Sequence, residues 1–310
     1  MKKTFFIIAV NLILLIFVGF LAECGSFYII RKIWCYPNNR FILDYKFILK
    51  KKDKLMQDTD EVFYKFQGSK NKSPIVLLGC SYTEGFSLKR EETFSANLSK
   101  NTGRTVYSYG LGGGSMATVL TQLQSKDFLK QIPQNTEYFI YTYIIDHNKR
   151  CHERSLGWEN DVLLDLYRVN DKQGIEKVPC GKVCCFINST ATGRLYRMTL
   201  GQYLAKSGDF SLPAAIIGEI SNILKTNFPK SKFAILVYDD DTDIIHLPLD
   251  FEEQKMNEIG EKNDIKILYT KKMSIGEEIL DGKYRASDDV HPSGEAWRKL
   301  VPDIIKELNL

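Results

Sequence analysis

The sequence predicts a doubly wound α/β sandwich, in which helices cover both faces of a mainly parallel β-sheet. From about Pro74 onward, short apolar runs alternate with longer stretches of helical character. The apolar runs are rich in β-branched and aromatic residues and do not alternate strictly with polar ones, which is typical of strands buried on both faces. This succession of strands and helices favours a parallel sheet joined by right-handed crossovers.

Five strands and five helices are expected in this part of the chain. The expected strands are 75–79, 105–110, 138–145, 233–238 and 265–269. The expected helices are 90–100, 115–129, 212–227, 251–262 and 293–308. Residues 151–205 show no clean period and predict an insertion within a domain that spans 74–310. Ligands of open parallel sheets bind beyond the carboxyl ends of the strands, so a site is expected in the segments that follow them.

Composition narrows the class of protein. The chain has 310 residues, of which 44% are hydrophobic and 26% charged, so a disordered or fibrous chain is excluded. Its net charge of +4 is too small to indicate a nucleic-acid partner, and none is expected. Seven cysteines in a chain of this length do not indicate a small scaffold held together by disulfides.

The N-terminal segment 1–30 is predicted to contain a transmembrane anchor. Residues 5–22 are almost wholly apolar and would span about 27 Å as a helix, close to a hydrocarbon core of roughly 30 Å. Lys2 and Lys3 precede this run and favour a cytoplasmic N-terminus. An uncleaved single-pass anchor fits better than a cleaved signal peptide or a lipoprotein anchor at Cys24, because LAECGS offers only poor processing sites. We therefore expect a bacterial inner-membrane protein whose main domain lies on the periplasmic or extracellular side.

Residues 31–73 are expected to form a juxtamembrane stalk. They are rich in lysine and aromatic side chains. A solvated stalk that packs loosely on the main domain is the simpler interpretation, and contact of Lys50, Lys51 and Lys52 with anionic lipid head groups is the alternative.

Residues suited to nucleophilic catalysis follow the first expected strand and precede the last expected helix. Ser81 comes directly after strand 75–79, and Asp288 and His291 lie three residues apart before helix 293–308. A serine hydroxyl is a poor nucleophile until a base takes its proton, and a carboxylate on the imidazole Nδ1 atom prepares the histidine for that task. Taken alone, the serine could cap a helix and the Asp–His pair could be a surface turn. Their order along the chain predicts a Ser–His–Asp site.

These segments resemble the sequence blocks of the SGNH or GDSL hydrolase family. LLGCSYTEG resembles the first block, with Ser81 as the nucleophile. YSYGLGGG resembles the second block, with Gly113 at the oxyanion hole, and DDVHP resembles the fifth, with Asp288 and His291 in the triad. The resemblance implies a three-layer α/β/α sandwich with a five-stranded parallel sheet. It also implies ester hydrolysis or acyl transfer through an acyl-enzyme, without a cofactor, and with the backbone N–H groups of Ser81 and Gly113 binding the oxyanion.

Three positions depart from the pattern of the family. Cys80 stands where the first block usually has an aspartate before the serine, and Ser108 stands where the second block often has an asparagine. The third block of the family supplies an asparagine side chain to the oxyanion hole, and Asp146 occupies that position here. An ionised aspartate cannot donate a hydrogen bond, and losing one oxyanion donor typically lowers turnover by about 10²–10³-fold. Asn148 is the first candidate for a substitute donor, and His147 or Arg150 are alternatives. Together with the predicted anchor, the resemblance indicates an acyl ester of an envelope glycan or lipid as substrate.

Three other functions fit parts of the sequence. Residues 113–117 approach a G-x-S-x-G nucleophile elbow, with Ser115 as nucleophile and with residues 239–241 and His291 completing it. The same glycine-rich turn hints at a dinucleotide-binding fingerprint, whose third glycine is missing. A module of SGNH-like shape that binds a glycan or a protein partner without turnover would account for Asp146.

The cysteines are expected to have structural roles. Cys151, Cys180, Cys184 and Cys185 lie in the insertion but lack the usual Cys-x-x-Cys spacing, so no metal site is expected. In an oxidising compartment a disulfide between Cys151 and one of the later three is the better interpretation. Cys80, beside the nucleophile, is expected to pack beneath the sheet.

Overall fold

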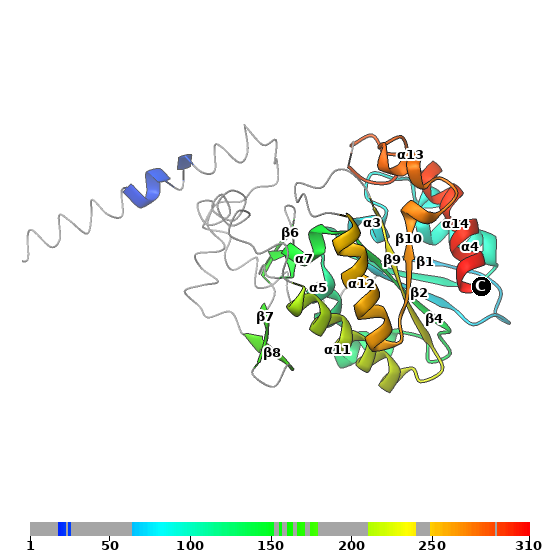
Figure 1. Ribbon diagram of the computed structural model, residues 1–310, viewed down its shortest axis with the longest axis horizontal. Coiled ribbons are helices and arrows are strands. Elements are labelled where there is room, and N and C mark those ends of the chain that lie inside the picture. The colour runs from blue at the N-terminus through cyan, green and yellow to red at the C-terminus, as the bar shows by residue number, and fades with distance from the viewer. Residues whose placement is uncertain are drawn as a thin grey trace, which may run out of the picture.

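The computed structural model describes residues 18–22, 24–25, 64–151, 155–156, 160–163, 166–170, 174–178, 210–239, 249–288 and 290–310. They contain a mixed α/β domain built around one mostly parallel sheet, which confirms the predicted fold class (Figure 1). In these ranges, no helix has both the length and the apolar character needed to cross a bilayer. The predicted span 5–22 lies outside them except for residues 18–22, so the anchor stays a prediction.

The central sheet has six strands in the order β1-β3-β2-β4-β9-β10. Five of them run parallel, namely β2 (Ile75–Gly79), β3 (Val106–Gly110), β4 (Tyr138–Tyr143), β9 (Lys232–Val237) and β10 (Lys266–Tyr269). These are the five strands expected from the apolar runs, with ends that differ by one or two residues. All five carboxyl ends therefore lie at the same edge of the sheet.

The prediction of a sheet with only five strands is wrong. A sixth strand, β1 (Tyr64–Phe66), pairs antiparallel with β3 at the edge, with Tyr64 opposite Ser108 and Phe66 opposite Val106. It has three residues and is only partly buried, so it lacks the continuous apolar run by which a central strand is recognised. Its residues belong to the segment expected to form a stalk.

Helices cover both faces of the sheet. One face is covered by α5 (Met116–Leu123), α6 (Lys126–Gln131), α11 (Ser211–Asn227) and α12 (Leu249–Asn263), and the other by α4 (Phe94–Thr102) and α14 (Gly294–Leu308) (Figure 1). Short helices lie in the connections, namely α3 (Ser81–Glu84), α7 (Asp146–Arg150), α13 (Gly276–Leu280) and the 3₁₀ turns Arg90–Glu92 and Thr270–Lys272. The expected helix 115–129 is divided in two, because the Ser125 hydroxyl accepts the N–H of Phe128 and begins α6.

Alternate strand side chains enter two separate apolar cores. In β2, Val76 and Leu78 pack beneath α5 and α11, whereas Ile75 and Leu77 pack beneath α4 and α14. Both sets are fully buried, which explains why β2 reads as a continuous apolar run rather than an alternating one. Burial of each such side chain stabilises the fold by about 1.5–3 kcal/mol.

The described part of the predicted insertion forms two short antiparallel ladders. In one, β5 (Ser155–Leu156) pairs with β6 (Asn160–Leu163), and in the other β7 (Leu166–Val169) pairs with β8 (Ile175–Val178). The hydroxyl groups of Tyr167 and Thr121 lie 2.9 Å apart, so β7 docks on α5.

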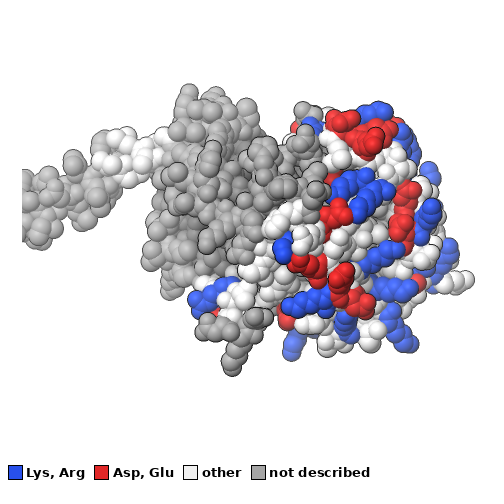
Figure 2. All heavy atoms as spheres, viewed as in Figure 1, with Lys and Arg blue, Asp and Glu red and all other residues white. Residues whose placement is uncertain are grey.

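Charged side chains of both signs are mixed over the described surface. Figure 2 shows Lys and Arg lying among Asp and Glu across the face in view, rather than gathered into a patch of one sign. Lys255 and Glu258 on α12, for example, form an ion pair at 2.7 Å.

Candidate active site

Ser81 lies at the carboxyl end of β2 and is the first residue of α3. The turn that leads to it needs a glycine, because Gly79 has φ +153° and a Cβ there would lie 2.3 Å from Thr83 Oγ1. The Thr83 hydroxyl in turn donates to the carbonyl oxygen of Leu78 at 3.3 Å and ties α3 back to the strand. This arrangement fixes Ser81 just beyond the end of β2.

Asp288 and His291 reach Ser81 from the turn before α14. His291 Nε2 lies 2.8 Å from Ser81 Oγ, and His291 Nδ1 lies 2.7 Å from Asp288 Oδ2. The other carboxylate oxygen, Oδ1, accepts the backbone N–H groups of Val290 and His291 at 3.1 and 3.0 Å. The three residues expected from the sequence thus form a continuous hydroxyl–imidazole–carboxylate chain.

Backbone hydrogen bonds hold this turn on the domain. The N–H of Ala286 donates to the carbonyl oxygen of His291 at 2.6 Å, and the N–H of Ser293 donates to that of Tyr284 at 2.7 Å. The Ser293 hydroxyl then accepts the N–H of Ala296 at 3.2 Å and begins α14. The imidazole is therefore presented from a segment anchored on both sides.

The environment of Asp288 keeps its carboxylate charged. Burial by itself raises the pKa of Asp288, but hydrogen bonds from the backbone N–H of His291 and from the Ser87 hydroxyl outweigh it and lower the pKa to about 2. The stability that this contributes is present above the unfolded pKa of about 3.9 and is lost as the pH falls through about 2. At neutral pH an ionised carboxylate therefore faces the imidazole.

Aromatic and apolar side chains border the imidazole. The rings of Tyr82 and Phe86 lie with their centroids 5.2 and 5.1 Å from that of His291. The Tyr82 hydroxyl donates to the carbonyl oxygen of Val290 at 3.1 Å. Phe86 and Val290 are among the few exposed large apolar side chains in the described part of the domain.

The glycine-rich turn after β3 lies against the end of β2. The N–H of Leu111 donates to the carbonyl oxygen of Gly79 at 3.0 Å, and the N–H of Gly114 donates to that of Leu111 at 2.8 Å. Gly113 has φ +71°, a left-handed conformation that favours glycine. The turn that carries Gly113 is therefore a neighbour of the residues that lead into Ser81.

Asp146, in the position of the family's asparagine, forms an ion pair. Its carboxylate lies 2.5 Å from Nε of Arg150, one turn later on α7. Arg150 Nη1 also donates to the carbonyl oxygen of Gly114 at 3.4 Å. The departure from the family's pattern thus belongs to a charged pair that connects the end of β4 to the glycine-rich turn.

The two residues that follow Asp146 both carry a buried side-chain nitrogen without a hydrogen-bond partner among the described residues, namely His147 Nε2 and Asn148 Nδ2. His147 Nδ1 lies 2.6 Å from the Tyr141 hydroxyl, and burial, aided by the charge of Arg150, holds the pKa of His147 well below its usual range. Asn148 is buried, and neither polar atom of its side-chain amide has a hydrogen-bond partner among the described residues. A buried amide without partners is costly, which marks Asn148 as a group that a ligand could satisfy.

The nucleophile elbow at Ser115 does not form around His291. The imidazole contacts Ser81, whereas Ser115 precedes α5 and its N–H donates to Thr118 Oγ1 at 3.1 Å. Asp239, expected to complete that elbow, accepts the N–H of Lys271 at 3.2 Å instead.

Asp239 and Glu252 are two buried carboxyl groups that lie close enough to influence each other. No sequence pattern predicts their proximity. Burial raises the pKa of Asp239 to about 6. Burial raises the pKa of Glu252 to about 7, and the nearby charge of Asp239 adds to the effect.

Replacement of Glu252 by glutamine is expected to stabilise the protein more at about pH 8 than at about pH 4.5. The unfolded carboxyl ionises near pH 4.3 and the folded one near pH 7, so the free energy of unfolding falls as the pH rises between those values. The amide removes a penalty on the order of 2–4 kcal/mol above pH 7. Urea unfolding at both pH values measures it, with Glu261→Gln on the same helix as the control. An equal difference at both pH values would contradict the expectation.

Cys80 and Cys151 are buried in the two apolar cores. Cys80 is fully buried, and burial raises the pKa of its thiol. The Cys151 thiol donates to the carbonyl oxygen of Asn148 at 2.9 Å. Cys151 is therefore a thiol in this structure, and the expected disulfide between it and a later cysteine is wrong here; Cys180, Cys184 and Cys185 lie outside the described residues. Across the described ranges, no three His, Cys, Asp or Glu side chains gather as a metal site would require.

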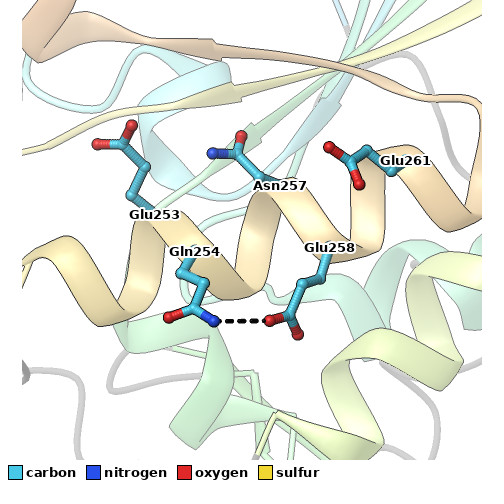
Figure 3. Close-up of a pocket in the computed structure, with 5 residues that line it drawn as sticks. All are labelled: Glu253, Gln254, Asn257, Glu258 and Glu261. Carbon is cyan, nitrogen blue, oxygen red and sulfur yellow. Dashed lines mark hydrogen bonds between the residues drawn. The ribbon is translucent and has the colours of Figure 1, made fainter.

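A depression on the outer surface lies away from the Ser81 site. Its lining comes from a single helix, α12, and consists of Glu253, Gln254, Asn257, Glu258 and Glu261 (Figure 3). The Gln254 amide donates to Glu258 at 3.0 Å. No residue of the Ser81–His291–Asp288 chain takes part in it.

Comparison with known proteins identifies solved structures of similar fold. No family model and no curated protein sequence matches the chain. A G-D-S-L family protein from Desulfitobacterium hafniense is 13% identical, with 76% of this chain and 99% of that chain covered and a TM-score of 0.44. An extracellular lipase from Streptomyces rimosus is also 13% identical, with 76% of this chain and 99% of that chain covered and a TM-score of 0.43.

A further similar structure is a family two carbohydrate esterase from Clostridium thermocellum, 8% identical, with 77% of this chain and 65% of that chain covered and a TM-score of 0.46. Because these identities and TM-scores are low, the chemistry is inferred from the atoms of the site itself.

Proposed function

We propose that the chain is an SGNH-type serine hydrolase that cleaves or transfers an acyl ester through Ser81, His291 and Asp288. The observation that carries the proposal is the pair of contacts at His291, 2.8 Å to the hydroxyl and 2.7 Å to the carboxylate. Both distances lie within the reach needed for proton transfer. A binding module that performs no chemistry has no need of this alignment.

The first half-reaction forms an acyl-enzyme. Ser81 Oγ attacks the acyl carbonyl carbon while its proton passes to His291 Nε2. Asp288 stabilises the resulting imidazolium through Nδ1. The tetrahedral intermediate then collapses, the C–O bond to the leaving alcohol breaks, and Nε2 returns the proton to that alcohol. The backbone N–H groups of Ser81 and Gly113 serve as oxyanion donors.

The second half-reaction releases the acyl group. A water molecule or a hydroxyl of an acceptor gives its proton to Nε2 and attacks the acyl carbon. The Ser81–acyl bond then breaks and the proton returns to Ser81 Oγ. With water the product is a free acid, and with a sugar hydroxyl it is a new ester, so the same residues serve hydrolysis and O-acyl transfer. No cofactor takes part.

The substrate class follows from the predicted location. An anchor at residues 5–22 would hold the domain on the outward face of a bacterial inner membrane, within reach of acylated envelope glycans and lipids. Small acyl groups on such molecules are the proposed substrates. A panel of chromogenic esters from acetyl to octanoyl, with Ser81→Ala as control, tests the activity. Hydrolysis that persists in Ser81→Ala would overturn the proposal.

Asn148 is proposed as the third oxyanion donor, and Asn148→Ala is expected to lower kcat by about 10²–10³-fold. Its amide has no partner among the residues that the structure describes, so the substitution removes no hydrogen bond seen there, and the thermal stability should change little. Kinetics and thermal unfolding of the same preparation measure both effects. A kcat within about threefold of the wild-type value would exclude the role.

A further inference from the structure

The loop after α3 touches the carboxylate end of the Ser81–His291–Asp288 chain. The Ser87 hydroxyl donates to Asp288 Oδ2 at 2.6 Å. This is the same oxygen that lies 2.7 Å from His291 Nδ1. Ser87 stands outside the sequence segments that resemble family blocks, and its contact with Asp288 joins residues 201 positions apart.

The backbone of Ser87 is in a conformation that serine rarely adopts. Its φ is +64°, in the left-handed region, where a residue with a Cβ atom pays about 1 kcal/mol or more. The other non-glycine residues with positive φ in the described ranges are Asp264 and Asn309, which directly follow helices and belong to types that tolerate this region. A strained residue at the rim of a candidate site indicates that its side chain is needed there.

The loop is fixed to the nucleophile's own helix. The N–H of Phe86 donates to the carbonyl oxygen of Ser81 at 3.0 Å, and the N–H of Leu88 donates to that of Gly85 at 3.1 Å. The Phe86 ring also packs against the imidazole of His291. The Ser87 hydroxyl is therefore held in place by the same segment that carries the nucleophile.

We propose that Ser87 is a positioning residue that fixes the Asp288 carboxylate against His291, an inference that rests on the proposed function. The Asp288 side chain is 23% exposed, so a mobile water would otherwise compete for Oδ2. The Ser87 hydroxyl occupies that position, orients the carboxylate and takes up part of its charge. It acts on the reaction through Asp288 and His291 and touches no reacting atom.

Two substitutions separate the hydroxyl from the strained backbone. Ser87→Ala and Ser87→Gly both remove the hydroxyl, but only glycine relieves the left-handed strain. We expect both variants to lose kcat equally, by roughly three- to tenfold, with KM within about twofold of the wild-type value. Thermal stability should differ, with the glycine variant higher. The proposal would be overturned if the less stable alanine variant lost clearly more kcat than the glycine variant, or if neither variant lost kcat. Asp264→Gly, which relieves strain elsewhere, should leave kcat unchanged.

A spectroscopic readout tests the proposal without relying on turnover. Without the Ser87 hydroxyl the Asp288 carboxylate is no longer held against His291, so the bond from His291 Nδ1–H should weaken and its proton resonance should move upfield in both Ser87 variants. A resonance unchanged from wild type in both variants would exclude the role. Absence of esterase activity in the wild type, together with a shifted resonance, would refute the proposed function and leave the Ser87–Asp288–His291 coupling standing.

Discussion

Ser81→Ala is expected to lower the rate of ester cleavage by about 10⁴–10⁶-fold. The substitution removes the hydroxyl that, in the described part of the chain, contacts the imidazole of His291, so no acyl-enzyme can form. Residual cleavage would come from oxyanion binding and positioning alone. Initial rates with acetyl and octanoyl esters, measured at equal concentrations of folded protein, give the ratio directly.

Ser115→Ala is the matched control for this experiment. Ser115 also follows a strand and precedes a helix, but its N–H contacts Thr118 and no histidine lies on its hydroxyl among the described residues. We expect a rate close to wild type, with at most the small loss of stability that a change at a helix N-terminus brings. Loss of activity in the Ser115 variant alone would transfer the nucleophile to the glycine-rich turn.

Asp288→Asn is expected to lower kcat by about 10⁴-fold. The carboxylate can only accept from Nδ1–H, which leaves Nε2 free to take the proton of Ser81. An amide can donate to Nδ1 and so favours the tautomer with the proton on Nε2, which cannot act as the base. Turnover of a short-chain ester, followed from neutral to alkaline pH, measures the effect.

Asp281→Asn provides the control for the loss of a negative charge near the C-terminal helix. Asp281 is exposed and follows α13, outside the hydrogen-bonded chain at Ser81. It should keep the wild-type rate. A similar loss in both variants would mean that the effect of Asp288 is a general electrostatic one, contrary to the orienting role argued for its carboxylate.

The parallel strands could be predicted because their sequences are short, continuous apolar runs. Val76, Leu77 and Leu78 are apolar in succession, and in a run this short, ended by Gly79, they are typical of a strand buried on both faces. β1 escaped prediction because its three residues are recognisable only from their pairing with β3. The division of helix 115–129 was readable in principle, because Ser125 is a residue type that begins helices.

The residues of the site also fall into those that the local sequence predicts and those that it does not. Ser81, Asp288 and His291 could be predicted because each lies beside the end of an element that can be recognised locally. The pair of Asp146 and Arg150 also carried a signal, since opposite charges four residues apart meet on one helix face. Ser87 carried none, because its role depends on a left-handed backbone and on a contact with Asp288, far along the chain.

The most direct test of the central claim is labelling with a serine-reactive fluorophosphonate probe, read by mass spectrometry of the modified peptide. The probe reports an activated serine whatever the natural ester is. We predict one modified residue, Ser81, with labelling abolished in Ser81→Ala and strongly slowed in His291→Ala. Modification at another serine, or labelling of Ser81 at the wild-type rate when His291 is replaced, would contradict the account.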